Sequence, residues 1–203
     1  LRPPAVPPML ARVHAPSRAP LLPAEPGRGM GLLAWCRAPL GRGGFAAVLD
    51  GAYRGRWDVL ELEGGEALKH WDAMPHLLDA FQTHGLTRSS LVLTNGGGAL
   101  SDAVGMAAAI WKRGVRVAHM PTTTLAMVDA AWGGKTGINW RGSTNQLGTF
   151  TLPEFVHLDV RWLATLPDRE RRAGLAAIAK HALPHAHLGP AHLAAWPAWG
   201  TSP

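Results

Sequence analysis

Side chains able to bind an anionic, hydroxyl-rich ligand gather between residues 121 and 145. They comprise an ammonium, a carboxylate, hydroxyls and amides, and belong to Lys135, Asp129, Thr122, Thr123, Thr136, Asn139 and Asn145. Lysine pairs with phosphate or carboxylate groups, whereas aspartate and asparagine bind sugar-like hydroxyls. The run Gly133–Thr136 looks like the end of a nucleoside-triphosphate phosphate loop, but that pattern requires glycine where this chain has Asp129. Two interpretations stay open on chemistry alone: a flexible ligand-binding loop, or a solvated glycine-rich loop.

A second candidate is the glycine turn Gly96–Gly98, which follows the apolar run Leu91–Asn95. The backbone N–H groups of such a turn can approach a phosphate, and a following helix N-terminus adds a favourable dipole. The turn is not the GxGxxG pattern, and tight turns also use glycine for steric reasons alone. It therefore indicates phosphate or dinucleotide binding only weakly.

Alternating strands and helices must position these residues. The pattern predicts a helix over 67–84 that stops at Gly85, a second helix over 102–112, and helical structure after Pro167. Strands are expected at 45–49, 57–62, 90–94 and 115–120. Such alternation predicts an α/β fold with a mostly parallel sheet.

Composition narrows the class of protein and its organisation. The chain has 203 residues, a formal net charge of +6 and one cysteine, which suits a reducing, cytoplasmic location. The arginines are scattered and apolar runs are short, so we expect neither a nucleic-acid partner nor a membrane span. Prolines crowd residues 1–44, which we expect to be a disordered extension, with an organelle transit peptide as the weaker alternative. The expected domains are 45–166, of α/β type, and 167–203, the truncated start of a helical domain.

The blocks from Gly64 to about Leu183 resemble, in order, those of the 3-dehydroquinate synthase family of sugar-phosphate cyclases. The most specific block is Val128–Asn139. The other blocks are Gly65–Lys69, Gly96–Asp102, Lys112–Gly114, Pro121–Thr123, Asn145–Phe150, Leu163–Pro167 and Lys180–Leu183.

This resemblance implies a Rossmann-like NAD-binding domain followed by an all-helical domain. It implies a lyase of the shikimate pathway, which closes a phosphorylated seven-carbon sugar acid into 3-dehydroquinate with loss of phosphate. The cofactors implied are NAD and a divalent metal, zinc or cobalt, and the expected assembly is a homodimer.

The resemblance also implies roles for individual residues. The substrate, its phosphate and neighbouring oxygens would be held by Asp129, Lys135, Asn145 and Lys180, with Arg113 reaching an anionic group across a dimer interface. The cofactor-binding residues implied are Gly65, Glu66, Lys69, Gly98, Ala99, Leu100, Asp102, Thr122, Thr123, Lys135, Leu163 and Thr165.

Several positions depart from the family pattern. Ala177 stands where the family has a metal-binding glutamate, and a methyl group cannot ligate a metal, so no metal ligand is assigned. Thr144 replaces a lysine, Ser101 replaces a glycine, and Asp50 lacks the asparagine expected two residues later. The family's metal-binding histidines lie further downstream than Pro203. We therefore expect this chain not to turn over substrate. Two other interpretations stay open: a non-catalytic NAD-binding relative, and a different sugar-phosphate cyclase.

Overall fold

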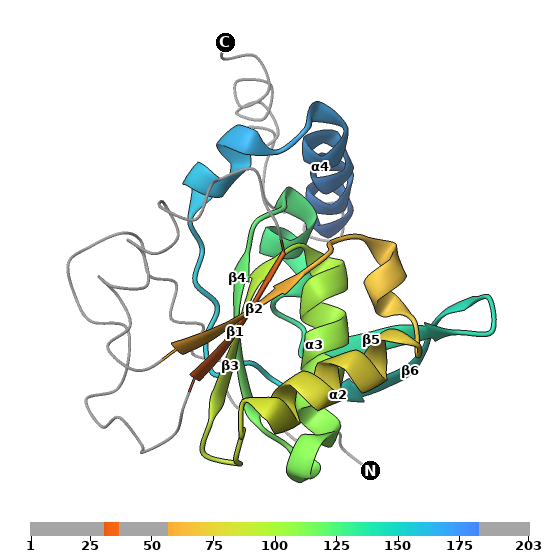
Figure 1. Ribbon diagram of the computed structural model, residues 1–203. Coiled ribbons are helices and arrows are strands. Elements are labelled where there is room, and N and C mark those ends of the chain that lie inside the picture. The colour runs from red at the N-terminus through yellow and green to blue at the C-terminus, as the bar shows by residue number, and fades with distance from the viewer. Residues whose placement is uncertain (1–30, 37–56, 183–203) are drawn as a thin grey trace, which may run out of the picture.

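The computed structural model describes residues 31–36 and 57–182. Its main sheet is parallel and has the strand order β2-β1-β3-β4 (Figure 1). The strands are β1 (Gly31–Cys36), β2 (Trp57–Leu62), β3 (Leu91–Gly96) and β4 (Arg116–Pro121). Together with the helices that join them, they confirm the expected α/β class and three of the expected strands, with bounds within two residues of those expected.

Strand β1 corrects the expectation that residues 1–44 are a disordered extension. It pairs along its length with β2 on one side and with β3 on the other. The hexapeptide is apolar and lies between Pro26 and Pro39, so no proline removes a ladder donor within it. The rest of that extension and the strand expected at 45–49 lie outside the described residues.

Helix α2 (Ala73–Thr83) begins later than the expected helix over 67–84. The first turn is a separate 3₁₀ helix, η1 (Glu66–Lys69), and His70 after it is extended, with φ −111° and ψ 152°. His70 forms an isolated parallel bridge with Asn139, so a long-range backbone contact overrides the local helical pattern there. Gly85 stops α2 as expected, with φ 63° and its N–H donating to the Gln82 carbonyl.

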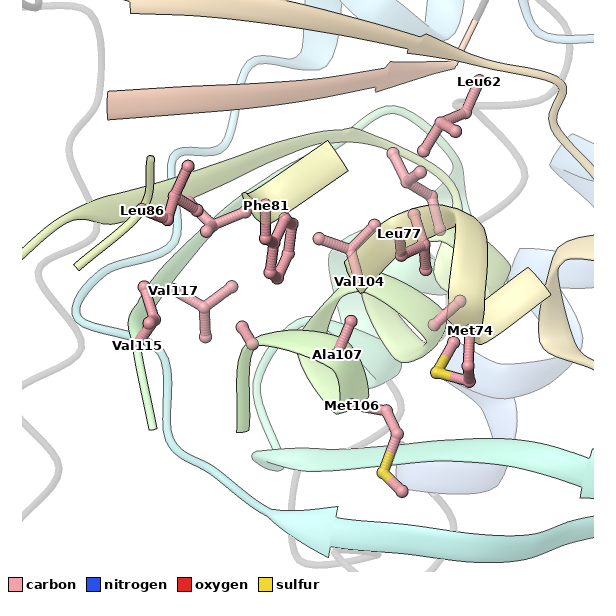
Figure 2. Close-up of a cluster of buried hydrophobic side chains, with 14 of the residues drawn as sticks. Leu62, Met74, Leu77, Phe81, Leu86, Val104, Met106, Ala107, Val115 and Val117 are labelled. Atoms are coloured by element: carbon pink, nitrogen blue, oxygen red, sulfur yellow. The ribbon is translucent and has the colours of Figure 1, made fainter. Parts of the chain in front are cut away.

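Helix α3 (Gly98–Ile110) packs between the parallel sheet and a separate β-hairpin (Figure 1). It begins directly after the glycine turn, four residues before the expected start. A short 3₁₀ helix, η2 (Trp111–Arg113), follows it. In Figure 2, Leu77 and Phe81 of α2 and Val104 and Ala107 of α3 face the buried side of the sheet. Met106 points from α3 toward the hairpin, so α3 contributes side chains to both interfaces.

The hairpin consists of β5 (Lys135–Trp140) and β6 (Ser143–Phe150), which pair antiparallel. This corrects the expectation of a flexible or solvated loop around Gly133–Asn139. Gly137 and Gly148 face each other across the two strands, and a Cβ on Gly148 would overlap the Thr136 carbonyl oxygen. The glycines therefore permit close strand pairing here rather than flexibility. The turn passes through Arg141 and Gly142 with φ 46° and 82°, as tight hairpins require.

Three helical elements complete the described chain: the π-helix η3 (Ala126–Ala130), the 3₁₀ helix η4 (Val160–Thr165) and the helix α4 (Asp168–Ala182). Helix α4 confirms the helical structure expected after Pro167. It approaches the segment before η3 closely, because a Cβ on Gly174 would overlap Thr124. Within residues 31–36 and 57–182, no helix has the length and apolar character needed to cross a membrane.

Candidate functional site

The glycine turn lies at the carboxyl end of β3, at the N-terminus of α3, as the sequence predicts. It is crowded by the residues that follow β4. A Cβ on Gly97 would come within 3.1 Å of Thr123 Cγ2, and one on Gly98 within 3.3 Å of Ala130 Cβ. The Thr122 N–H donates to the Gly96 carbonyl at 2.9 Å. Glycine is therefore needed to bring the two segments together, and the α3 dipole favours an anion at this edge of the sheet.

A buried lysine joins three elements beside this turn. The Lys69 ammonium, on η1, lies 2.7 Å from Oδ2 of Asp102, on α3. It also donates to Oδ1 of Asn145, on β6, at 2.7 Å. Lys69 is only 8% exposed, so both contacts satisfy a cation that has little access to water.

Asn139, on β5, extends this network toward solvent. Its Nδ2 donates to Oε1 of Glu66 at 2.9 Å, and its Oδ1 accepts from the Asn145 backbone N–H at 3.0 Å. We call the five residues Glu66, Lys69, Asp102, Asn139 and Asn145 the polar cluster. It brings together residues up to 79 positions apart in sequence, since Glu66 and Asn145 are its ends.

The electrostatics of the cluster centre on Asp102. Burial raises the pKa of its carboxyl, the hydrogen bond and positive charge of Lys69 oppose that rise, and the nearby Glu66 carboxylate adds to it. The lysine thus offsets the cost of placing two carboxylates near each other. A phosphate arriving at the turn would meet a site with a cation already fixed in place.

The remaining predicted residues differ in exposure and in the elements that carry them. Thr123 Oγ1 accepts from the N–H of Ala126, the first residue of η3, at 3.2 Å. Asp129, within η3, and Lys135, at the start of β5, are both exposed. Gly65 precedes η1 with φ 106°, a conformation that glycine adopts without strain. Ala99 and Leu100 lie in the first turn of α3, and they directly follow the glycine turn in sequence.

Arg113 is placed far from the polar cluster within one chain. It lies in η2, after the C-terminal end of α3, whereas the glycine turn lies before the N-terminal end. A 13-residue helix spans about 20 Å. The structure therefore places Arg113 at the opposite end of α3 from the glycine turn of the same chain.

The last expected site residues lie on η4 and α4. Thr165 donates to the Trp162 carbonyl at 3.4 Å within η4, the turn that also carries the half-buried Leu163. Lys180 is exposed on α4, and Ala177 lies half-buried one turn earlier. Ala177 cannot supply a metal ligand, and the described residues contain no group of three His, Cys, Asp or Glu side chains placed to hold a metal.

Asn139 is the functional candidate that sequence reasoning missed as a site residue. The spacing of residues 121–145 marks it as one available amide. Nothing in that spacing indicates that it contacts Glu66, which lies 73 positions away. Its place in the most specific sequence block was the only available signal.

Solved structures show which class of protein has this arrangement. ValA, a 2-epi-5-epi-valiolone synthase from Streptomyces hygroscopicus subsp. jinggangensis solved with NAD⁺ and Zn²⁺ bound, is 33% identical with a TM-score of 0.67; the match covers 72% of this chain and 41% of ValA. A 2-deoxy-scyllo-inosose synthase complexed with carbaglucose-6-phosphate, NAD⁺ and Co²⁺ is 25% identical with a TM-score of 0.63, covering 72% of this chain and 40% of that one. The fold is thus that of the N-terminal part of sugar-phosphate cyclases.

Sequence comparison narrows this class to one family. The sequence model of the family described as 3-dehydroquinate synthase N-terminal matches residues 59–173 of this chain. A 3-dehydroquinate synthase of Prochlorococcus marinus is 44% identical over 124 residues, which are 61% of this chain and 34% of the relative. The chain belongs to the 3-dehydroquinate synthase family. It spans about a third of the length of the curated relatives that it matches.

Proposed function

We propose that this chain binds NAD at the carboxyl edge of β3 and β4, with the pyrophosphate over the glycine turn. The observation that carries the proposal is the buried Lys69 ammonium, held by Asp102 in the second turn of α3, about one helical turn from the glycine turn. A fixed cation and a helix dipole are complementary to a diphosphate. NAD and a divalent metal, as Zn²⁺ or Co²⁺, are bound in two solved relatives of the same fold.

We further propose that the reaction of the complete site is that of 3-dehydroquinate synthase. It closes a phosphorylated seven-carbon sugar acid into 3-dehydroquinate, with elimination of phosphate. NAD, when bound, supplies reversible oxidation of one substrate hydroxyl. Lys135 and Asn145 would bind the substrate phosphate and neighbouring oxygens, and the exposed Asp129 carboxylate would accept a hydrogen bond from a hydroxyl.

The metal expected for this reaction does not fit the residues present. Ala177 takes the place of the ligating glutamate, and its methyl group offers no donor atom. We therefore propose that this chain alone does not release phosphate from the sugar acid. The same observation favours a second candidate, a non-catalytic relative that retains only the NAD site.

The first experiment is calorimetric titration of the purified chain with NAD⁺. We expect saturable binding that Asp102→Ala weakens by about tenfold, because the variant leaves the buried lysine without its counter-ion. The matched control is Asp79→Ala, which removes an exposed carboxylate from α2. Absence of saturable binding by the folded chain would refute the proposed NAD site.

A second experiment tests whether this chain catalyses the reaction. Phosphate release is measured with the phosphorylated sugar acid, NAD⁺ and added Zn²⁺ or Co²⁺. We expect NAD⁺ binding without phosphate release, because Ala177 supplies no metal ligand. Phosphate release from the sugar acid above the protein-free rate would contradict the proposal drawn from Ala177 and support full enzyme activity. Phosphate release from a different sugar phosphate would indicate another cyclase.

We also propose a homodimer in which Arg113 serves the site of the second copy. Its position beyond the C-terminal end of α3 keeps it from its own polar cluster. Light scattering after size-exclusion chromatography tests the dimer. A monomer at high concentration would remove the basis for any role of Arg113 in substrate binding.

A further inference from the structure

Asn139 occupies an irregular point in the hairpin. Ile138 pairs with Leu147, whereas Trp140 pairs with Ser143, so the register shifts between these two pairs. Asn139 alone on β5 therefore faces the three residues 144–146 on β6. This is a β-bulge, in which extra residues on one strand lose their regular backbone partners.

The Asn139 side chain closes this bulge. Its Oδ1 accepts from the Asn145 backbone N–H at 3.0 Å, in place of a backbone carbonyl. Asn145 has φ 53°, a left-handed conformation that asparagine tolerates better than most residues. Asn139 thus supplies the acceptor for the backbone N–H of the residue with the left-handed conformation in the bulge.

The same side chain also anchors the hairpin to η1. Its Nδ2 donates to Glu66 Oε1 at 2.9 Å, and the neighbouring backbone bridges His70. Asn139 is 6% exposed, so both of its polar atoms depend on these partners. Asn145, by contrast, is exposed, and its Oδ1 reaches the Lys69 ammonium at 2.7 Å.

We propose that Asn139 is a positioning residue, which holds the Asn145 side chain and the Glu66 carboxylate in place for NAD and substrate without touching either. One amide serves both because the hairpin bulge and η1 lie on opposite sides of it. This inference rests on the proposed function, which assigns Asn145 to the substrate phosphate, and on the role in NAD binding that the family resemblance implies for Glu66. It adds a residue to which no binding role is assigned.

Two substitutions separate the two bonds of Asn139. Asn139→Ala removes both of them. Asn139→Asp keeps the acceptor for the Asn145 N–H but removes the donor to Glu66 and places a second carboxylate beside it. Ser143→Ala is the matched control, since Ser143 is an exposed residue on β6, the other strand of the same hairpin.

The first measurement is hydrogen exchange of the Asn145 backbone amide by NMR of chains labelled with ¹⁵N-asparagine. Loss of one neutral hydrogen bond corresponds to exchange that is about tenfold faster. We expect that acceleration in Asn139→Ala, and exchange at the wild-type rate in Asn139→Asp and Ser143→Ala. A folded Asn139→Ala chain with unchanged exchange would overturn the proposal.

The second measurement is NAD⁺ affinity of the same chains. We expect both Asn139 variants to bind about tenfold more weakly than Ser143→Ala, because Glu66 is released in each. Unchanged affinity in a folded Asn139→Asp chain would show that the contact with Glu66 is structural only, which contradicts a positioning role. If the wild-type chain itself binds no NAD⁺, the proposed function fails, while amide exchange still decides whether Asn139 holds Asn145.

Glu66→Gln combined with Asn139→Asp provides a rescue. The swap lets the new glutamine amide donate to the new aspartate, which restores the bond with donor and acceptor exchanged. We expect the double variant to recover the urea midpoint lost in Asn139→Asp. A double variant less stable than both single variants would mean that the two side chains do not interact, contrary to the proposal.

Discussion

Lys69 and Asp102 form a 2.7 Å ion pair that links η1 to the second turn of α3. Lys69 is 8% exposed and the Asp102 side chain 18% exposed, so water screens the pair only in part. The pair thereby holds the four-residue helix η1 against α3. Its removal affects both the architecture and the proposed site.

Asp102→Asn tests the structural part of that link. Asparagine keeps the size and can still accept from Lys69, but the charge is lost, so we expect a decrease of about 1–2 kcal/mol in the free energy of unfolding. Urea denaturation measures the change. Asp79→Asn, on the exposed face of α2, is the control and should change stability by less than about 0.5 kcal/mol. Equal effects of the two substitutions would contradict the argument.

Gly105→Ala tests the contact between α3 and the hairpin. An added Cβ would lie 2.6 Å from Thr136 Cγ2. We expect a loss of about 1–3 kcal/mol from overpacking, although alanine favours a helix. Thr136→Ser removes the offending methyl group and keeps the hydroxyl that lies 2.7 Å from Thr149 Oγ1. The double variant should therefore recover most of the stability in thermal unfolding, and failure to recover it would locate the strain elsewhere.

Gly174→Ala tests how α4 is seated. Its new Cβ would overlap Thr124 and come within 2.9 Å of the Leu125 backbone nitrogen. We expect α4 to shift and the amides of 168–180 to exchange faster by mass spectrometry. Ala176→Gly, at an exposed position of the same helix, is the opposite substitution and should cost about 1 kcal/mol through propensity alone. If Gly174→Ala instead slows exchange, helix propensity outweighs the contact with Thr124.

His119 gives the chain a pH-dependent stability. Burial lowers the pKa of its imidazole to about 4, well below 6.5 in the unfolded chain. Between these values the unfolded chain binds a proton that the folded chain does not. Stability therefore falls as pH decreases from 6.5 toward 4, by up to about 3 kcal/mol from this residue.

His119→Gln should remove this contribution. Glutamine does not titrate and could keep a hydrogen bond to Thr94 Oγ1, which lies 2.8 Å from the histidine Nδ1. Between pH 4 and 6.5, we expect the free energy of unfolding of the variant to depend less on pH than that of the wild type. The difference between the two slopes should be about 1.4 kcal/mol per pH unit. His76→Gln, at an exposed position of α2, is the control and should leave the slope unchanged. A slope unaltered in the His119 variant would place the protonation elsewhere.

Ala177→Glu tests the interpretation of the metal site. One carboxylate provides a single ligand, whereas a catalytic zinc site takes about three from the protein. We therefore expect no stoichiometric zinc binding by elemental analysis of the dialysed variant, and no phosphate release from the sugar acid. Zinc retained at one ion per chain in this variant, but not in the wild type, would show that the other ligands are present after all.

Local patterns predicted strands of the parallel sheet from two signals. The strand at 57–62 follows from alternation of apolar and polar residues, and the strand ending in the glycine turn follows from an apolar run bounded by glycine. The hairpin over Lys135–Phe150 could not be predicted in the same way. Its glycines look like loop residues, and only their cross-strand contacts show that they serve close pairing. Strand β1 was not predicted, because the many prolines within residues 1–44 indicated a disordered segment.

The candidate site was predictable as a set of residues but not as a network. The resemblance placed Glu66, Lys69, Asp102 and Asn145 together in a ligand site. Their mutual contacts depend on the bulge opposite Asn139 and on how the hairpin seats on α3. Such register effects arise from tertiary packing, which periodicity in a single sequence does not record. The contacts of Arg113 across a second copy remain a prediction.

The position of β1 determines which fragments of the chain keep the parallel sheet. Among the described strands, β2 meets the rest of the parallel sheet only through β1. A fragment trimmed to the family match at residues 59–173 would sever β2 from β3 and leave two backbone edges open. A fragment that keeps the parallel sheet must therefore include β1 from Gly31, and cleavage between residues 37 and 56 would remove the covalent link between β1 and β2.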